Sequence, residues 1–132
     1  MHSTVVRPKP ASSEEALNHF QSHLQYETDC WDVHYALTNN LHDFVLLDVR
    51  AIETAKQGYI DGAVLMPYTD IHKASLEAYP PDAVYVVYCA GPHCNATEKA
   101  AIRLARLGRP VKKMIGGVTG WIDEGFELKS DA

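Results

Sequence analysis

Basic residues, cysteines and long apolar runs are all scarce in this chain of 132 residues. Its 12 lysines and arginines against 17 aspartates and glutamates give a net charge of -5, which disfavours a binding surface for nucleic acid or an anionic membrane. No apolar stretch approaches the length that spans a bilayer. The opening residues lack the apolar segment of a secretory signal. We therefore expect a soluble cytoplasmic protein without nucleic-acid or membrane partners.

The three cysteines make a poor disulfide framework, because Cys89 and Cys94 lie close together while Cys30 is far away in the sequence. Such sparse usage indicates a reducing compartment. The chain length suits one domain with one core. We expect residues 1–11 to form an extended lead-in and residues 12–132 to form that domain.

The chain is organised around residues 84–98. An unbroken β-branched and aromatic run, residues 84–88, is typical of a strand buried on both faces of a parallel sheet. A short loop follows, beginning with Cys89, and Asn95 then stands at the cap position of a helix predicted over residues 96–107. In α/β proteins, ligands bind at the carboxyl ends of such strands. The loop N–H groups and the helix N-terminus can hold an anion there and favour thiolate over thiol.

Strand and helix patterns alternate along the rest of the chain. We predict helices over 13–25, 31–38, 51–57 and 118–124, strands over 26–28, 44–50 and 111–115, a short strand ended by Pro67, and weak helical turns over 69–79. This alternation implies an α/β sandwich around a largely parallel sheet. On the second helix Trp31 and Leu37 should face inward, and Cys30 should be a buried structural thiol.

The first predicted helix carries a capping box and an apolar stripe. Ser12 precedes Glu15 by three residues, and the stripe consists of Leu17, Phe20 and Leu24. His19 and His23 lie one turn apart and could reach one metal ion. Because no third ligand is evident, a solvated helix face is the better interpretation.

Two opposite charges, Asp48 and Arg50, end the strand predicted over 44–50. Charges at the end of a buried strand need a partner, water or a ligand. We favour a structural role near the site for Asp48. For Arg50 both an ion pair and a contact with substrate at a pocket rim stay open.

Three motifs, in the right order within residues 44–126, resemble the single-domain rhodanese family of sulfurtransferases. They are residues 47–50 with Glu53 and residues 58–63, Tyr88-Cys89 with Gly91, and Gly116-Gly117 with Trp121 and Gly125. Tyr59 stands where the family commonly has a histidine. The resemblance implies a rhodanese-like three-layer sandwich, with a mainly parallel five-stranded sheet flanked by helices.

The same resemblance implies that Cys89 is the catalytic nucleophile and carries sulfane sulfur as a persulfide. Its thiolate would attack a donor such as thiosulfate and expel sulfite, and a thiol, a thioredoxin-like protein or cyanide would then take the sulfur. No cofactor and no metal are expected. The residues expected to bind substrate are Ala90, Gly91, Pro92, His93, Cys94, Asn95 and Arg50.

The loop departs from common versions of the family. It holds no arginine or lysine, and Pro92 lacks an N–H group, so anion recognition rests on backbone dipoles and on His93, which is equally well explained as a solvated residue. For Cys94 we favour a small residue buried beneath the loop. Alternatively, it resolves the persulfide or closes a disulfide with Cys89. A zinc site of these two cysteines and His93 lacks the usual ligand spacing.

Other functions remain as alternatives. Cysteine phosphatases place an arginine at the end of a similar loop to clamp an oxyanion, and Asn95 occupies that place here, which disfavours phosphate-ester hydrolysis. A thiol redox enzyme would use Cys89 and Cys94. A non-catalytic binding module of the rhodanese type is disfavoured by the presence of Cys89. The sequence leaves the oligomeric state open.

Overall fold

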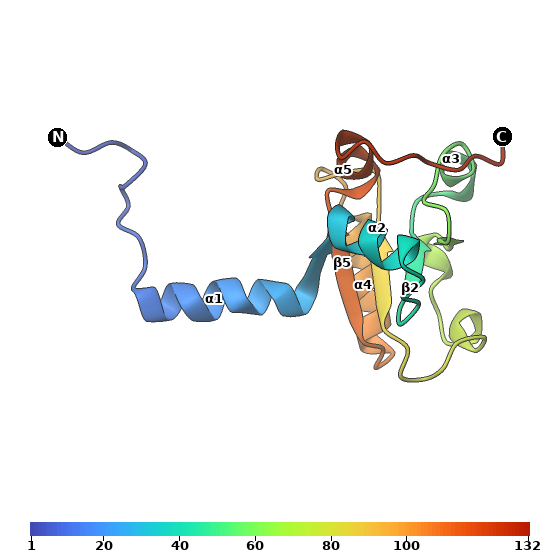
Figure 1. The fold of residues 1–132 in the computed structure, drawn as a ribbon. Helices are drawn as coiled ribbons and strands as arrows, with labels where there is room; N and C mark the ends of the chain where they lie inside the picture. The colour runs from blue at the N-terminus through green and yellow to red at the C-terminus, as the bar shows by residue number, and fades with distance from the viewer.

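The computed structural model describes residues 1–132, and its centre is a five-stranded sheet with the order β1-β5-β4-β2-β3, in which every neighbouring pair is parallel (Figure 1). The strands are β1 (Glu27–Asp29), β2 (Val45–Asp48), β3 (Val64–Leu65), β4 (Tyr85–Tyr88) and β5 (Val111–Ile115). The helices are α1 (Ser13–Tyr26), α2 (Cys30–Thr38), α3 (Ile52–Ala55), α4 (Ala96–Arg106) and α5 (Gly117–Asp123), with 3-10 turns η1 (Tyr68–Asp70) and η2 (Ala74–Leu76). The predicted three-layer sandwich, with a five-stranded parallel sheet flanked by helices, is confirmed.

Strand β4 is the middle strand, as its unbroken apolar run predicts, and all four of its residues are buried. Side chains alternate between the two faces of a strand. Tyr85 and Val87 therefore pack on one face with the α4 residues Ala100 and Leu104. The next residue on that face is Cys89, so the strand directs the cysteine side chain to the side of the sheet that α4 covers.

The opposite face is covered by α2 and α5; in Figure 1, α2 lies in front of the sheet, α5 at its top end and α4 behind it. Helix α2 begins at Cys30, and Asp29 caps it by accepting a hydrogen bond from the N–H of Asp32 at 2.8 Å. The inward orientation predicted for Trp31 is wrong, because its side chain is 55% exposed. Helical periodicity brings Cys30 and Val33 to the core and leaves Trp31 outside, stacked on Tyr35.

Helix α1 projects away from the sheet (Figure 1). The predicted capping box is present, since the N–H of Glu15 donates to Ser12 Oγ at 3.2 Å. No residue of α1 is buried, and Leu17, Phe20 and Leu24 are 57%, 64% and 71% exposed. The apolar stripe therefore forms a helix without meeting the core of its own chain. None of the helices combines the length and apolar character needed to cross a bilayer.

Candidate active site

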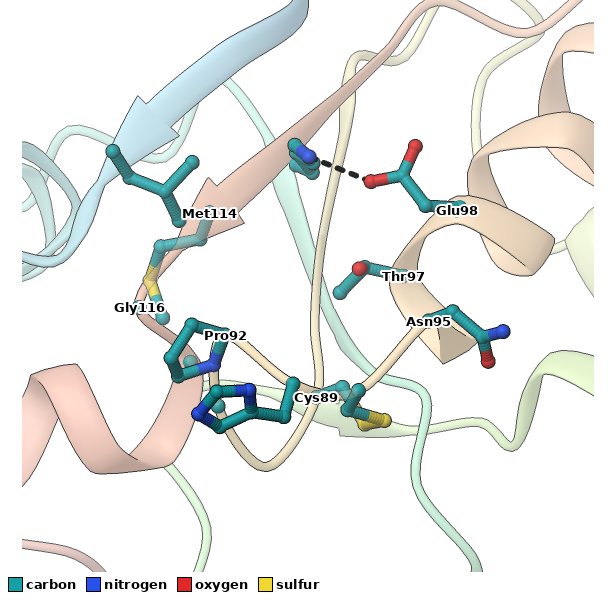
Figure 2. A pocket seen from close by; sticks show the side chains of 13 residues that line it. Cys89, Pro92, Asn95, Thr97, Glu98, Met114 and Gly116 are labelled. Atoms are coloured by element: carbon teal, nitrogen blue, oxygen red, sulfur yellow. Dashed lines mark hydrogen bonds and ion pairs between the residues drawn. A yellow bond between two sulfur atoms is a disulfide. The ribbon is translucent and has the colours of Figure 1, made fainter.

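The loop between β4 and α4 lines a cavity of about 290 Å³ at the carboxyl end of the sheet. Its walls come from the loop itself, the first turn of α4, the end of β5 and the start of α5. Figure 2 shows Cys89 lying between Pro92 and Gly116 on one side and Asn95 and Thr97 on the other. The structure thus brings five of the predicted binding residues together, namely Gly91, Pro92, His93, Cys94 and Asn95.

Cys89 is bonded to Cys94 in a disulfide that crosses the loop. The loop folds back because the N–H of Cys94 donates to Gly91 O at 3.2 Å, which leaves the Cα atoms of the two cysteines 6.3 Å apart. Cys89 is 3% exposed and Cys94 is half-buried. The favoured interpretation of Cys94 as a small residue merely packed beneath the loop is therefore wrong, and the disulfide alternative is the one observed.

Unpaired backbone N–H groups surround this loop. The first backbone donor of α4 to find an acceptor is Lys99, so the N–H groups of residues 95–98 donate to no atom of the chain. The same holds for Gly91 and His93. Asn95 occupies the predicted cap position, but its side chain makes no capping hydrogen bond and points away from the cavity in Figure 2. An open helix start with free donors is suited to an anion.

The first residues of α5 donate hydrogen bonds to the backbone at the start of the loop. The N–H of Val118 donates to Cys89 O at 3.0 Å, and the N–H of Thr119 donates to Ala90 O at 2.9 Å. Gly117 has a φ of +60°, and a Cβ there would lie 2.5 Å from Cys89 O. Only glycine suits this close approach. Ala90 is exposed and does not line the cavity.

Asp48 and Arg50 form a buried ion pair outside the cavity. Asp48 is 0% exposed, and the Arg50 guanidinium donates to Asp48 Oδ1 at 2.9 Å and to Gly58 O at 2.6 Å. Asp48 thereby has the structural role predicted for it. Arg50 is not among the residues that line the cavity. Its predicted contact with substrate has no support in this geometry.

The model of the rhodanese-like domain family matches residues 33–124, which is more than half of the chain. The chain belongs to this family. Its rhodanese-like domain carries Cys89 at the start of the loop after the middle strand, where the sequence resemblance puts the reactive cysteine.

Individual relatives cover different parts of the chain. The crystal structure of BH2092 from Bacillus halodurans is 33% identical, covers 90% of this chain and 87% of its own, and has a TM-score of 0.86. Residues 27–132 are 106 of the 132 residues, which is less than the 90% of the chain that the match covers. The match therefore extends into α1. Thiosulfate sulfurtransferase from Pseudomonas aeruginosa is 21% identical, covers 85% of this chain and 21% of its own at a TM-score of 0.67, and so shows the fold alone.

A curated relative is a longer protein. The HTH-type transcriptional regulator Rv0324 of Mycobacterium tuberculosis is 33% identical over an alignment of 90 residues, which covers 63% of this chain. The match spans only 39% of that regulator's length.

The rhodanese-like domain has one cavity-lining cation that sequence reasoning missed. Lys113 on β5 donates to Glu98 Oε1 at 2.6 Å, and this hydrogen bond raises the pKa of Lys113. The ammonium group is therefore present at neutral pH, but Glu98 holds it at the cavity wall. The sequence shows two lysines inside the predicted last strand, but it does not give the register, in which Lys113 pairs with Val87 beside the loop.

The third cysteine lies outside the cavity. Cys30 is 5% exposed, and burial, followed by the charges of Asp29 and Glu124, raises its pKa to about 11. Its thiol stays protonated at neutral pH, as expected of a structural cysteine. No group of three or more His, Cys, Asp or Glu side chains is arranged to hold a metal ion.

Proposed function

We propose that this domain is a sulfurtransferase that moves sulfane sulfur, through a persulfide on Cys89, from thiosulfate or a persulfide donor to a thiol or cyanide. The observation that carries the proposal is the position of Cys89 in a cavity lined by Asn95, Thr97 and Glu98, whose backbone N–H groups are unpaired. Such N–H groups stabilise a thiolate and can bind an anionic sulfur-donor substrate at the same place. Membership of the rhodanese-like family supports the same chemistry.

The reaction starts from the open, dithiol form of the loop, which a thiol produces by reducing the Cys89–Cys94 disulfide. The Cys89 thiolate bonds to the outer sulfur of thiosulfate, and the donor's sulfur–sulfur bond breaks, its electron pair leaving on sulfite. The product is a persulfide anion on Cys89. Cyanide or a thiol then takes the outer sulfur and restores the thiolate. We also propose a cytoplasmic location, where thiols would keep the loop open.

A second candidate is a redox-responsive binding module. Two observations favour it, namely the disulfide that occupies Cys89 and the transcriptional regulator among the relatives. In this function, closing and opening of the loop would signal to a partner, and no sulfur would be transferred in turnover. Phosphate-ester hydrolysis has less support, because the cavity lining contains no arginine.

Turnover separates these functions. The reduced Cys94→Ser chain, which cannot close the loop disulfide, is incubated with thiosulfate and excess cyanide, and sulfite and thiocyanate are measured over time. A sulfurtransferase forms both products in many equivalents per chain. A binding module releases at most one equivalent of sulfite, and a phosphatase instead hydrolyses phenyl phosphate. Absence of turnover with thiosulfate and with a persulfide donor such as glutathione persulfide would contradict the proposal.

Lys113 should attract the anionic donor. Replacing it with alanine should raise the KM for thiosulfate about tenfold, the factor that a contact of about 1.4 kcal/mol supplies. Glu98→Gln should lower this KM, because the ammonium of Lys113 is released from its carboxylate partner. Lys112→Ala is the matched control, since Lys112 bonds to Leu24 O and does not line the cavity. An unchanged KM in Lys113→Ala would remove Lys113 from donor binding.

A further inference from the structure

The second loop cysteine has a chemical role that simple sulfur transfer does not need. Cys94 reaches the sulfur of Cys89, as the disulfide shows, and both residues line the same cavity. In an ordinary transfer cycle the Cys89 sulfur bonds only to the sulfur that it carries. A second thiol within bonding distance competes with every external acceptor, because it needs no encounter.

We propose that Cys94 resolves the Cys89 persulfide and releases its outer sulfur as sulfide, an activity that rests on the proposed sulfurtransferase function. The Cys94 thiolate bonds to the inner sulfur, which is Cys89 Sγ. The bond between inner and outer sulfur breaks, and its electron pair leaves on the outer sulfur, which takes up the proton that the Cys94 thiol gave up and departs as HS⁻. The two cysteine sulfurs are oxidised to the observed disulfide and the transferred sulfur is reduced to sulfide, so no further oxidant is required.

Burial favours attack from inside the loop. In the observed state Cys89 is 3% exposed, whereas Cys94 is half-buried and lies directly before Asn95, the first of the residues whose N–H groups are unpaired. An external thiol therefore reaches the inner sulfur with difficulty, while Cys94 is already beside it. The unpaired N–H groups of residues 95–98 favour both the Cys94 thiolate and the departing anion.

This chemistry defines the partner that completes a cycle. After one turn the loop is closed, and a dithiol must reopen it by thiol–disulfide exchange before Cys89 can react again. The complete reaction converts thiosulfate and a dithiol to sulfite, sulfide and a disulfide. The acceptor class is therefore a dithiol reductant, such as a protein with thioredoxin-like chemistry, rather than a monothiol that carries the sulfur away.

A single turnover tests the inference. The protein is reduced, freed of reductant without air, and given one equivalent of thiosulfate. Wild type should release one sulfite and one sulfide per chain and should show the intact mass of the disulfide form. Cys94→Ser should release one sulfite and no sulfide, and its mass should increase by one sulfur atom. Cys30→Ser, which removes a cysteine outside the cavity, should behave as wild type.

The outcomes separate this inference from the function on which it rests. If wild type releases sulfite, keeps the added sulfur and forms no sulfide, the resolving role of Cys94 is overturned and the sulfurtransferase proposal stands. If no sulfite appears, both are overturned. The wild-type masses and products decide the question even if the Cys94→Ser chain does not fold.

A different observation, the exposed stripe of α1, carries a second proposal. Beside the C-terminal end of α1 lies a groove of about 440 Å³. Its apolar lining consists of Tyr26, Ala101, Ile102, Ala105 and Val111. Because α1 runs directly into β1 with no intervening residue, the stripe of Leu17, Phe20 and Leu24 cannot fold back onto this groove of its own chain.

We infer that the groove and the stripe bind a second copy of this chain, with the two α1 helices antiparallel. The charges support this orientation. Glu14 and Glu15 stand at the N-terminal end of α1, and at the opposite end Lys112 Nζ bonds to Leu24 O at 2.6 Å. Antiparallel pairing aligns the helix dipoles favourably and brings Glu14 and Glu15 of one helix beside Lys112 of the other, while Lys113 stays paired with Glu98. The related B. halodurans protein shares part of this helix.

The mass in solution tests the dimer. Sedimentation equilibrium of wild type at micromolar concentration should give twice the chain mass of 14.7 kDa. Phe20→Glu should give a monomer with an unchanged circular dichroism spectrum, while the same change at exposed Asn18, on the polar face, should leave the dimer intact. Reversal of both charges, Glu14→Lys with Glu15→Lys, should weaken the dimer. A wild-type monomer, or a dimer that survives Phe20→Glu, would overturn the inference.

Discussion

Replacing Cys89 with serine should lower sulfite release from thiosulfate by about a thousandfold or more, to the background rate, because the bond-forming atom is lost. A serine hydroxyl is not ionised at neutral pH and cannot hold the transferred sulfur as a persulfide. The measurement is sulfite formed per chain in the presence of a dithiol. The fold should be retained, since the change replaces one buried atom at the end of β4.

The control for this loss is Cys30→Ser. Cys30 is also buried, but its raised pKa keeps it protonated and it lies outside the cavity, so its removal should leave sulfite release within about twofold of wild type. If the Cys89→Ser protein releases sulfite as fast as wild type, Cys89 is not the nucleophile. Equal losses in both variants would indicate damage to the fold instead.

The second large effect concerns stability. Asp48→Asn should lower the free energy of unfolding by about 3–5 kcal/mol, because it leaves the buried Arg50 guanidinium without its counter-charge. The pair is almost fully shielded from water, with side-chain exposures of 9% for Arg50 and 0% for Asp48. Urea unfolding, followed by circular dichroism in wild type and variant, measures the difference.

Asp61→Asn makes the same chemical change in an exposed ion pair. Asp61 lies 3.9 Å from Lys129 Nζ, and the two side chains are 82% and 55% exposed. Solvent screens such a pair, so its loss should change stability little. Equal unfolding midpoints for Asp48→Asn and wild type would show that the buried pair does not hold the turn after β2.

The central part of the fold was predictable because its signals are local. The continuous apolar run at residues 84–88 predicts a strand buried on both faces, and β4 is that strand. Asp29 and Asn95 mark helix starts by their place before periodic apolar residues, and α2 and α4 begin there. The start of the loop at Cys89 follows from where the strand ends.

Features that depend on contacts distant in sequence were not predictable. Lys113 reaches the cavity because β5 lies beside β4, and the order of strands in the sheet cannot be inferred from any single segment of the sequence. The Cys89–Cys94 bond depends on how the loop folds back, which spacing does not fix. The apolar stripe of α1 predicts a helix but not what covers it. For Arg50 the sequence left open an ion pair and a contact with substrate, and the structure shows the ion pair with Asp48.

The most direct measurement of the central claim is the intact mass of the reduced Cys94→Ser chain after incubation with thiosulfate, because this chain cannot close the loop disulfide. The account predicts a gain of one sulfur atom, located by peptide mapping on the fragment that contains Cys89 and removed by dithiothreitol. An unchanged mass, or an added sulfur located on Cys30, would contradict it.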